Sequence, residues 1–498
     1  MNYFIGLDSG GTFMKAGLYD SAGELHGLAK VSASVITEKP GWVERNLDHL
    51  WSDACSAINN LLDTTDICPT KIKGISISAQ GKGVYLIDKK GNNLRNGILS
   101  SDSRSLSIVK QWHQEGLNTE IYPTTKQTLW TGHPVSIMRW LKEHEPDNYK
   151  NVGAIFMAHD YLRYRLTGSV HAELTNMSES NFFNAQTSDY DKNLLSMFGI
   201  EEMWEALPPL IASDNLAGYI TDEAALKTRL APGTPVYGGL FDVVSTALCS
   251  GINADNEKLN YVMGTWSVTS GITDKVSQEE YNFVYGYHAI ANQYIVHEAS
   301  PTSASNYEWF CRYFGDENAF DHDTIAKEVT EVIDEEHDVL FVPFLYGSNQ
   351  GLGLRSGFYG LQSHHTRGDL VKAVWEGILF CHNLHLNRMK HRFPNTDVLR
   401  VTGGPTASDV WMQMLANVTG MNVEIPNVQE TGALGAATIA MVGAGDYADV
   451  VSAISHFESD VRHFEPQLSK THYYQKKYAR YQKLVTLFKA MEESKDAE

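Results

Sequence analysis

The chain opens with a predicted strand, a glycine turn and a second predicted strand, and this unit limits the folds available to it. In "YFIGLDSGGTFMKAGLYD" an apolar run, Tyr3 to Leu7, leads into Asp8 and then into the turn Ser9-Gly10-Gly11-Thr12. Glycines let a backbone approach a bulky anion closely, so the turn is typical of a phosphate-binding loop. An ordinary glycine hairpin has the same residues, so the turn alone favours neither interpretation.

The segment after the turn excludes two common nucleotide-binding folds. "FMKAGLYD" alternates in polarity, with Met14, Ala16 and Leu18 on one face, which predicts a strand. A dinucleotide fold needs GxGxxG, and a P-loop needs GxxxxGKS or GxxxxGKT, in each case at the start of a helix. The sequence therefore predicts a phosphate hairpin, in which the turn amides and the Thr12 hydroxyl face a phosphate.

Two charged side chains flank this hairpin. Asp8 ends the first predicted strand, where its carboxylate would hold Mg²⁺ through water, because a hard cation prefers carboxylate and phosphate oxygens. Lys15 lies three residues after Thr12. The pattern leaves open whether Lys15 faces the phosphate or solvent.

Composition narrows the class of protein. The 498 residues suffice for two domains, and the formal net charge of -20 argues against a nucleic-acid partner, which requires a basic face. The five cysteines are scattered without a CxxC pair, which argues against a disulfide framework or a zinc site. No signal peptide or membrane-spanning apolar run is visible. We expect a cytoplasmic protein without membrane partners, and a homodimer is compatible with these features.

A second strand–turn–strand unit lies near the middle of the chain. "LNYVMGTWSVTSGIT" again predicts two strands joined by a turn, Gly264 to Ser267. Two such turns on two domains would clamp one polyphosphate between them. The repeat indicates an internal duplication, and we predict an α/β protein with domains at residues 1–248 and 249–498.

A third glycine turn, Gly403-Gly404, joins a predicted strand to a predicted helix in "VLRVTGGPTASDVWMQMLANVTG". Glycines there allow the close approach of a flat ligand such as adenine, although a tight strand–helix connection uses them as well. Thr406 and Asp409 predict a capping box at the start of the helix.

Asp242, in "GGLFDVVSTA", is the candidate catalytic residue. Its apolar and small neighbours place it at the start of a buried helix. A carboxylate at such a position accepts the proton of a substrate hydroxyl, and the alternative role is a plain helix N-cap.

Polar turns after two apolar strands supply further candidates. "SAQGKG" and "SSDSR" contain Gln80, Lys82, Asp102 and Arg104, a mixture of donors and acceptors that suits a polyhydroxylated substrate. The alternative for Asp102 and Arg104 is a local ion pair. His133 faces either the core or the substrate. The histidines show no HExxH spacing, so we expect no metal held by protein ligands alone.

In this order, these pieces resemble the FGGY family of carbohydrate kinases over nearly the whole chain. "GHPVSIMRWLKEH" and "SGFYGLQSHHTRGDLVKAVWE" resemble the two family signatures, with departures at Ile137 and Trp375. "GGPTASDVWMQMLANVTG" resembles the adenosine segment of the family, and "ETGALGAA", from Glu430, resembles its glycine-alanine helix.

The resemblance implies an actin-like fold of two ribonuclease-H-like domains that binds ATP and Mg²⁺. It assigns Asp242 as the catalytic base and Asp8 to Mg²⁺. The nucleotide-binding residues that it implies are Gly10, Gly11, Thr12, Lys15, Gly264, Thr265, Ser267, Gly403, Gly404 and Asp409. The sugar-binding residues that it implies are Gln80, Gly81, Lys82, Asp102, Arg104, His133, Phe241 and Asp242.

The sugar turns differ from those of D-xylulose kinases in the family. Gly81-Lys82 replaces Met-His, and "LSSDSR" lacks the tryptophan that is common before the aspartate. "ISAQGKG", "TLWTGHPVS", "GGLFDVVSTALC" and "HEASPTS" are instead similar to members acting on L-xylulose and 3-keto-L-gulonate. We therefore expect an ATP-dependent kinase of a ketopentose or a related keto-acid in carbohydrate catabolism. A further hypothesis is that the Lys82 ammonium pairs with a substrate carboxylate, which would favour the keto-acid over a neutral ketose.

Other functions are compatible with the same pattern. Within the family, the alternatives are a D-xylulose, ribulose or glycerol kinase. Outside it, the alternatives are an actin- or chaperone-type ATPase without a sugar substrate and a non-catalytic sugar sensor. The polar sugar turns and Asp242 argue against the ATPase, and no helix-turn-helix segment is visible that would support a sensor.

Overall fold

The computed structural model describes residues 2–264, 266–276, 283–300, 302–314, 322–348, 350, 354–457 and 461–495. The chain forms two compact units. The first consists of residues 1–251, 273–296 and 428–458, and the second of residues 252–272, 297–427 and 459–498. We predicted a division after residue 248. The chain first leaves the first unit after Gly251, and it then returns to that unit twice.

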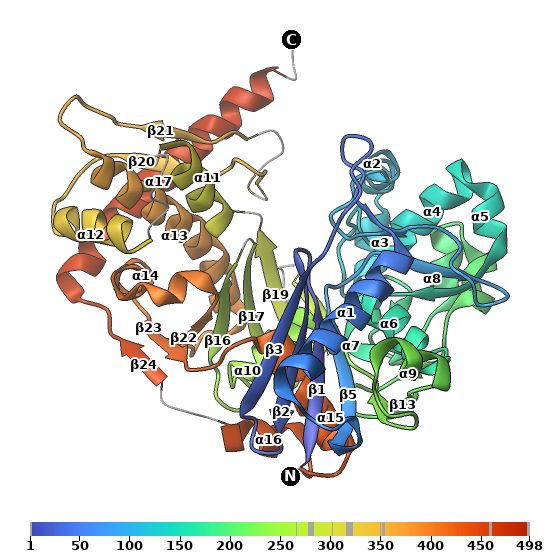
Figure 1. The fold of residues 1–498 in the computed structure, drawn as a ribbon. Helices are drawn as coiled ribbons and strands as arrows, with labels where there is room; N and C mark the ends of the chain where they lie inside the picture. Colours follow the sequence, from blue (N-terminus) through green and yellow to red (C-terminus); the bar gives the residue numbers. More distant parts are fainter. Residues whose placement is uncertain are drawn as a thin grey trace. The chain divides into compact units, whose positions relative to one another are not determined.

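The first unit is built on a mixed sheet with the strand order β13-β14-β5-β1-β2-β3, in which β15 also pairs with β5 (Figure 1). The predicted opening hairpin is present, because β1 pairs antiparallel with β2 and β2 with β3, while β1 and β5 run parallel. The strands are β1 (Tyr3–Ser9), β2 (Phe13–Asp20), β3 (Leu25–Ser32), β5 (Ile72–Ala79), β13 (Leu216–Tyr219), β14 (Pro235–Tyr237) and β15 (Leu240–Phe241).

The two faces of β1 pack against different helices, because successive side chains of a strand point to opposite faces. Ile5 and Leu7 join a core that includes buried residues of α1 (Leu47–Thr65) and α6 (Ala158–Thr167). Gly6 and Asp8 point to α15 (Thr431–Gly443). The other helices beside this sheet are α9 (Asp222–Thr228), α10 (Asp242–Cys249) and α16 (Val450–Phe457).

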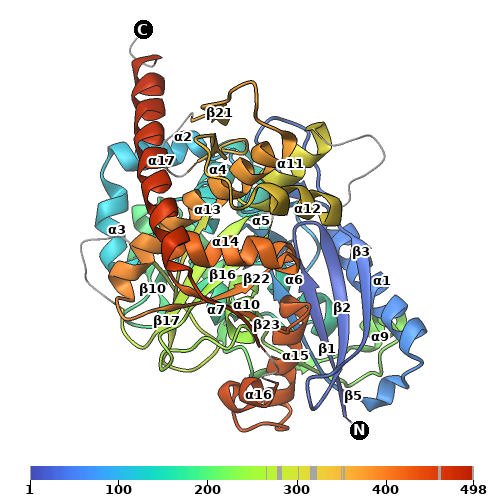
Figure 2. The same ribbon diagram turned by 90° about the vertical axis from the view of Figure 1, so that its left-hand side faces the viewer.

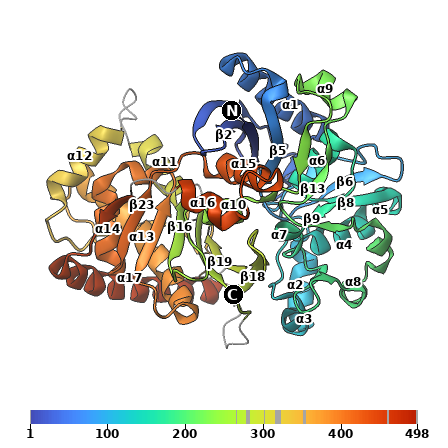
Figure 3. The same ribbon diagram turned by 90° about the horizontal axis from the view of Figure 1, so that it is seen from below.

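A second hydrophobic cluster of this unit is formed by side chains between residues 84 and 206, and Figure 3 labels the helices of this stretch, α2 to α8. Trp140 belongs to it, buried on the apolar face of helix α4. The cluster and the residues packed against it come from β6 (Tyr85–Asp88), β7 (Gly97–Ile98), α2 (Leu106–Gln114), α3 (Leu117–Thr125), α4 (Pro134–His144), α5 (Pro146–Asn151), β8 (Val152–Phe156), β9 (Ala172–Glu173), α7 (Leu174–Met177), α8 (Lys192–Met197) and β12 (Leu210–Ile211). Strand β10 (Phe183–Asn184) lies in the same stretch of chain but contributes no residue to the cluster. Two short strands, β4 (Glu44–Arg45) and β11 (Asp189–Tyr190), complete the small sheets.

The second sheet has the order β18-β19-β17-β16-β22-β23-β24, and Figure 2 labels four of its strands, β16, β17, β22 and β23. As in the first sheet, its opening hairpin is antiparallel, and the first strand of that hairpin pairs in parallel with a later strand. This topological repeat agrees with the predicted duplication. The strands are β16 (Leu259–Met263), β17 (Ser267–Thr273), β18 (Val284–Tyr287), β19 (Tyr294–Ser300), β22 (Val398–Thr402), β23 (Asn422–Pro426) and β24 (Val461–Phe464).

The helices of the second unit include a long helix, α13, and the C-terminal helix α17. In its core, the indoles of Trp375 and Trp411 stack with their centroids 4.5 Å apart. The elements are α11 (Ala304–Phe314), α12 (His322–Val332), β20 (Leu340–Val342), β21 (Gly357–Tyr359), α13 (Arg367–Arg392), α14 (Asp409–Thr419) and α17 (Leu468–Lys495). Among the described residues, no helix is long and apolar enough to cross a membrane.

The predicted capping box of Thr406 and Asp409 is wrong. Helix α14 begins at Asp409, and the hydroxyl of Ser408 accepts from the amide of Trp411. Thr406 instead donates to the carbonyl of Gly403 at 2.7 Å, within a turn of 3-10 helix over Gly404–Ala407. Ser408 lies next to the helix, so it serves as the cap, while Thr406 belongs to the preceding turn.

We expect Gly6→Ala to destabilise the protein by about 2–3 kcal/mol, because a methyl group there overlaps the α15 backbone at Ala433 and the packed helix has little room to move. Gly357→Ala is the matched control, since a methyl group at that strand position meets nothing within 4 Å. Thermal and urea unfolding measure both changes. Equal stability of the two variants would contradict the close packing of α15 on β1.

Candidate functional site

Three parallel strands of the first unit end at the same level, and the predicted site residues follow them. Ser9 of β1 lies beside Ala79 of β5, and Phe241 of β15 lies beside the same alanine. The next residues are Gly10, Gln80 and Asp242. In α/β sheets, ligands bind outside the carboxyl ends of parallel strands. The fold therefore brings together the glycine turn, the first polar turn and the candidate base.

The side chain of Arg45 fixes the backbone of the glycine turn. Its buried guanidinium donates to the carbonyls of Gly10 and Gly11, the latter at 3.0 Å. The Gly10 amide closes the turn by donating to Phe13. Gly11 and Thr12 are exposed. With the carbonyls bound by Arg45, the exposed side of the turn presents the residues predicted to face a phosphate.

Lys15 lies on the same face of the hairpin as Asp8. The two residues are direct cross-strand partners, and such partners share a face of the sheet. The Lys15 ammonium lies 2.8 Å from Glu430 and 3.8 Å from Asp8. Lys30 also binds Glu430, at 2.6 Å. Although burial opposes it, hydrogen bonds from the two lysines lower the pKa of Glu430.

Asp8 is largely covered by the first turn of α15. A methyl group at Gly432 would overlap the Asp8 carboxyl group, so glycine is required for this approach. Burial raises the pKa of Asp8 to about 6, and the charge of Glu430 adds to this while Lys15 opposes it.

Asp242 is the first residue of α10, and its carboxyl group is half-buried. Burial raises its pKa to about 7, and the negative charge of Asp8 adds to the increase. Lys82 opposes the increase and Glu179 supports it, so both charges lie within electrostatic range of Asp242. A carboxyl group with a pKa near neutrality is suited to accept a proton from a substrate hydroxyl.

Lys82 forms an ion pair with Glu179. The ammonium lies 2.6 Å from the carboxylate, whose side chain is fully buried, and 5.4 Å from the centroid of the Phe241 ring. Lys82 has a left-handed backbone, and its amide donates to Asn176. A methyl group at Gly81 would overlap the Phe241 ring, so this polar turn packs directly on the residue that precedes Asp242.

His133 is buried beside this ion pair. Burial lowers its pKa well below the usual value, and the charge of Lys82 contributes. The Asn181 amide nitrogen lies 3.0 Å from Nδ1, and when this nitrogen donates, the proton of the neutral ring is on Nε2. Among the described residues, Nε2 has no hydrogen-bond partner. His133 therefore offers one donor to a polar ligand.

Asp102 and Arg104 form the local ion pair that we considered as the alternative. Arg104 binds both carboxylate oxygens of Asp102 at 2.8–2.9 Å, and its guanidinium also contacts Glu44. It lies 3.9 Å from the ring of Trp42 and 5.1 Å from that of Trp140. Both charged side chains are almost completely buried. The pair thus fixes the shape of its turn.

The second unit places two glycine turns at one sheet edge. Strands β16 and β22 run parallel with Val262 beside Thr402, so Gly264 and Gly403 follow at neighbouring strand ends. Gly403 has φ = 113°, and a methyl group there would overlap the Met263 backbone. Gly404 is open, since a methyl group would meet nothing within 4 Å.

The remaining predicted nucleotide-binding residues lie at the same edge or outside the described residues. Ser267 is buried at the start of β17. Asp409 is exposed and forms an ion pair with Arg462. Thr265 lies outside the described residues.

Sequence reasoning did not identify three charged residues of this region: Arg45, Glu179 and Glu430. Arg45 and Glu179 have no motif around them in the sequence. Glu430 stands in "ETGALGAA", a segment already singled out, so the only available signal was its place before a glycine-rich helix.

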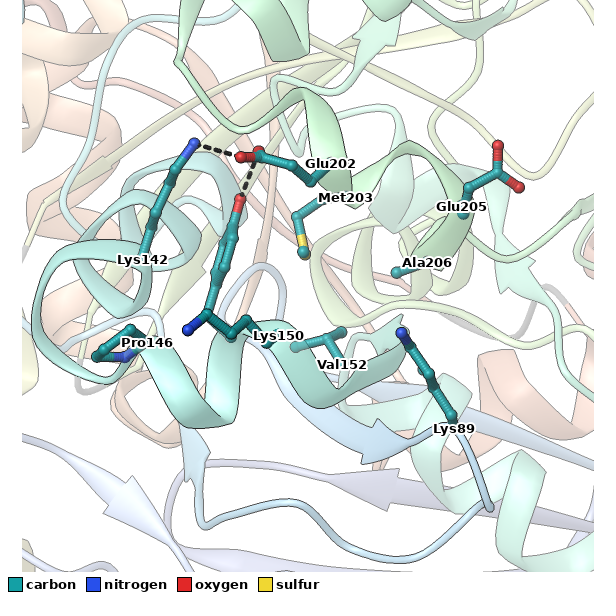
Figure 4. A pocket seen from close by; sticks show the side chains of 11 residues that line it. Lys89, Lys142, Pro146, Lys150, Val152, Glu202, Met203, Glu205 and Ala206 are labelled. Atoms are coloured by element: carbon teal, nitrogen blue, oxygen red, sulfur yellow. Dashed lines mark hydrogen bonds and ion pairs between the residues drawn. The ribbon is translucent and has the colours of Figure 1, made fainter.

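A pocket of about 650 Å³ lies elsewhere on the first unit, and none of the predicted site residues lines it (Figure 4). Lys142 and Tyr149 both donate to Glu202 at its wall. Among the described residues, no cluster of histidine, cysteine, aspartate or glutamate is arranged to hold a metal ion.

Comparison with known proteins gives close matches over the full length. Models of the N-terminal and C-terminal domains of the FGGY family of carbohydrate kinases match residues 3–249 and 259–444. A Pasteurella multocida (strain Pm70) protein named "Probable L-xylulose kinase" is 51% identical over 99% of this chain and 100% of its own. An Escherichia coli (strain K12) protein named "L-xylulose/3-keto-L-gulonate kinase" is 49% identical over 97% of this chain and 96% of its own.

A solved structure supports the fold. The ligand-bound xylulose kinase from Lactobacillus acidophilus superposes with a TM-score of 0.87, covering 98% of each chain, at 22% identity. At this identity, the likeness concerns the fold alone.

Asp242→Asn should stabilise the folded protein at pH 8 by about 1–2 kcal/mol, a value reduced for partial solvent exposure. The folded pKa of Asp242 is about 7 against an ordinary 3.8, so the wild-type protein loses stability as the pH rises through this interval. The gain should shrink as the pH falls from 8 to 5. Thermal unfolding across this range measures it, with Asp222→Asn as control, since exposed Asp222 also begins a helix. A gain that does not vary with pH would contradict the raised pKa.

Proposed function

The chain belongs to the FGGY family of carbohydrate kinases and is an ATP-dependent carbohydrate kinase, and from this premise we propose that its substrate is L-xylulose or the related 3-keto-L-gulonate. The observation that supports this substrate class most strongly is the identity of about half the residues, over nearly the whole chain, to the two relatives whose names carry these sugars. Such a kinase acts in carbohydrate catabolism.

The roles of the site residues are part of this proposal. Asp242 is the catalytic base. The phosphates of ATP bind to Gly10, Gly11, Thr12, Lys15, Gly264, Thr265 and Ser267, and the adenosine binds to Gly403, Gly404 and Asp409. The sugar binds to Gln80, Gly81, Lys82, Asp102, Arg104, His133 and Phe241. Asp102 and Arg104 would act mainly by fixing the turn that borders the sugar, because their charges neutralise each other.

Features of the turns fit a nucleotide. Gly404 has open space in front of it, and Gly403 adopts a backbone conformation that favours glycine. Gly11 and Thr12 are exposed, and Lys15 supplies a cation on the face that carries Asp8. These are the groups that a polyphosphate and a flat base require.

Mg²⁺ fits beside Asp8. The carboxyl group is of the type that a hard cation prefers, and its raised pKa reflects burial that a bound cation would offset. When bound with ATP, the ion neutralises charge on the phosphates. Asp8 would hold it through water.

The chemistry assigned to this chain is proton transfer and orientation. Asp242 orients the sugar hydroxyl and accepts its proton as the hydroxyl oxygen bonds to the γ-phosphorus and the bond to ADP breaks. Glycine-turn amides and Lys15 stabilise the charge of the transferring group, and such preorganised electrostatics usually supply most of the rate enhancement. His133 donates from Nε2 to a sugar oxygen.

A coupled assay of ADP release tests the substrate. We expect kcat/KM to be highest with L-xylulose and lower with D-xylulose, ribulose and glycerol. A higher value with D-xylulose or glycerol would contradict the substrate assignment, and ATP hydrolysis that no sugar stimulates would contradict sugar phosphorylation altogether.

Asp242→Asn should lower kcat by about 10²–10⁴-fold while leaving ATP and sugar binding within a few-fold, because an amide cannot accept the hydroxyl proton. Steady-state kinetics and calorimetric titration measure the two effects. Asp222→Asn makes the same change at an exposed helix start and should behave as wild type.

In the wild-type enzyme, kcat/KM should fall as the pH drops below about 7, since Asp242 is then protonated and no longer acts as a base. Near-normal turnover of Asp242→Asn, or a wild-type profile that is flat from pH 8 to pH 5.5, would remove Asp242 from the role of base.

A further inference from the structure

The cation of the sugar turn is already neutralised by the protein. Lys82 was expected to bind a substrate carboxylate, but its ammonium lies 2.6 Å from Glu179, whose side chain is fully buried, and only 14% of the Lys82 side chain is exposed. The amide of the same lysine is bound to Asn176, so both ends of the residue are held.

Glu179 is fixed at least as firmly as Lys82. A methyl group at Gly286 of β18 would overlap the Glu179 carboxyl group, so the strand leaves room for this side chain by means of a glycine. The amide of Tyr287 donates to Ser178, which ties the same strand to the segment that carries Glu179. The Glu179 carboxylate is therefore held in a fixed position beside Lys82 and its turn.

We propose that Glu179 is a specificity-determining residue, which neutralises Lys82 and so makes the site select an uncharged ketose over an anionic keto-acid. This inference rests on the proposed function. It reverses the expectation that the ammonium of Lys82 favours a keto-acid.

The reason is the cost of separating the pair. If Lys82 turned to a substrate carboxylate, the fully buried Glu179 would lose its ion pair with Lys82, and removing one partner of a buried pair is strongly unfavourable. If the pair stayed intact, an incoming carboxylate would meet the negative charge of Glu179 together with the positive charge of Lys82. An uncharged hydroxyl or carbonyl group suffers neither penalty.

The other titratable groups around the pair supply no spare positive charge. His133 is neutral, because burial lowers its pKa well below the usual value. Asp242 is acidic, and both Lys82 and Glu179 act on it electrostatically. Arg104 is paired with Asp102 and Glu44 and adds no free cation. With the charges of Lys82 and Glu179 also cancelling, the proposed sugar-binding groups among the described residues carry no unpaired positive charge, which disfavours an anion.

Glu179→Gln tests the proposal, because it keeps the shape of the side chain and leaves Lys82 as an uncompensated cation. We expect the ratio of kcat/KM for 3-keto-L-gulonate to that for L-xylulose to rise at least tenfold, equivalent to about 1.4 kcal/mol. The change should lie mainly in the KM for the keto-acid. The KM for ATP, measured with L-xylulose, should stay within about twofold.

Two matched variants separate charge from packing. Glu179→Asp keeps the charge and should keep the wild-type ratio, whereas the double variant Lys82→Met with Glu179→Gln removes both charges and should show no gain for the keto-acid. A Glu179→Gln ratio within twofold of wild type, or an equal gain in the double variant, would overturn the proposal.

The wild-type enzyme provides a test that needs no variant. It should use L-xylulose with a higher kcat/KM than 3-keto-L-gulonate, and the reverse order would overturn the role of Glu179 while leaving a keto-sugar kinase intact. A wild-type enzyme that phosphorylates neither sugar would instead contradict the proposed function itself.

Discussion

The close approach of helix α15 to strand β1 holds the first unit and its candidate site together. The helix comes from residues 431–443, far along the chain, and it packs on β1 only because Gly6 has no side chain. A second glycine, Gly432, lets the first turn of the helix meet the carboxyl group of Asp8. The residue before the helix, Glu430, then reaches Lys15. Packing and electrostatics at the phosphate hairpin thus depend on one helix–strand contact.

This arrangement gathers negative charge where we propose that a cation and a polyphosphate bind. Asp8 and Asp242 both have raised pKa values, because burial removes water from them and each carboxylate lies near other negative charge. Buried carboxyl groups without full compensation cost folding free energy, and such strain is typical of catalytic sites. Arg45 offsets none of this charge directly, but it binds the carbonyls of the glycine turn and so holds the hairpin in shape.

Much of the architecture, and the class of kinase, could be predicted from the sequence. The comparisons confirm the family, the fold class and the enzyme class. Alternating polarity predicted the opening hairpin, and the structure contains it. The prediction of Thr406 as the capping residue of α14 was wrong. Threonine and serine are both suitable caps in a sequence, and only the path of the backbone decides that Ser408, not Thr406, bonds to the helix. The sequence left open which face of the hairpin carries the Lys15 side chain. The strand register answers this, because it places Lys15 directly opposite Asp8.

The sequence by itself determined that glycine turns follow strands and that Asp242 stands at a strand–helix junction. It also determined that a lysine, Lys82, occupies the polar turn "SAQGKG". Each of these is a local pattern of polarity and spacing. Only the tertiary structure decided what charge that lysine presents. Lys82 and Glu179 are 97 positions apart, and no periodicity relates them. Their pairing arises because the polar turn after β5 and the segment around Ser178 fold against one another. A buried charge must then be neutralised by a partner within reach.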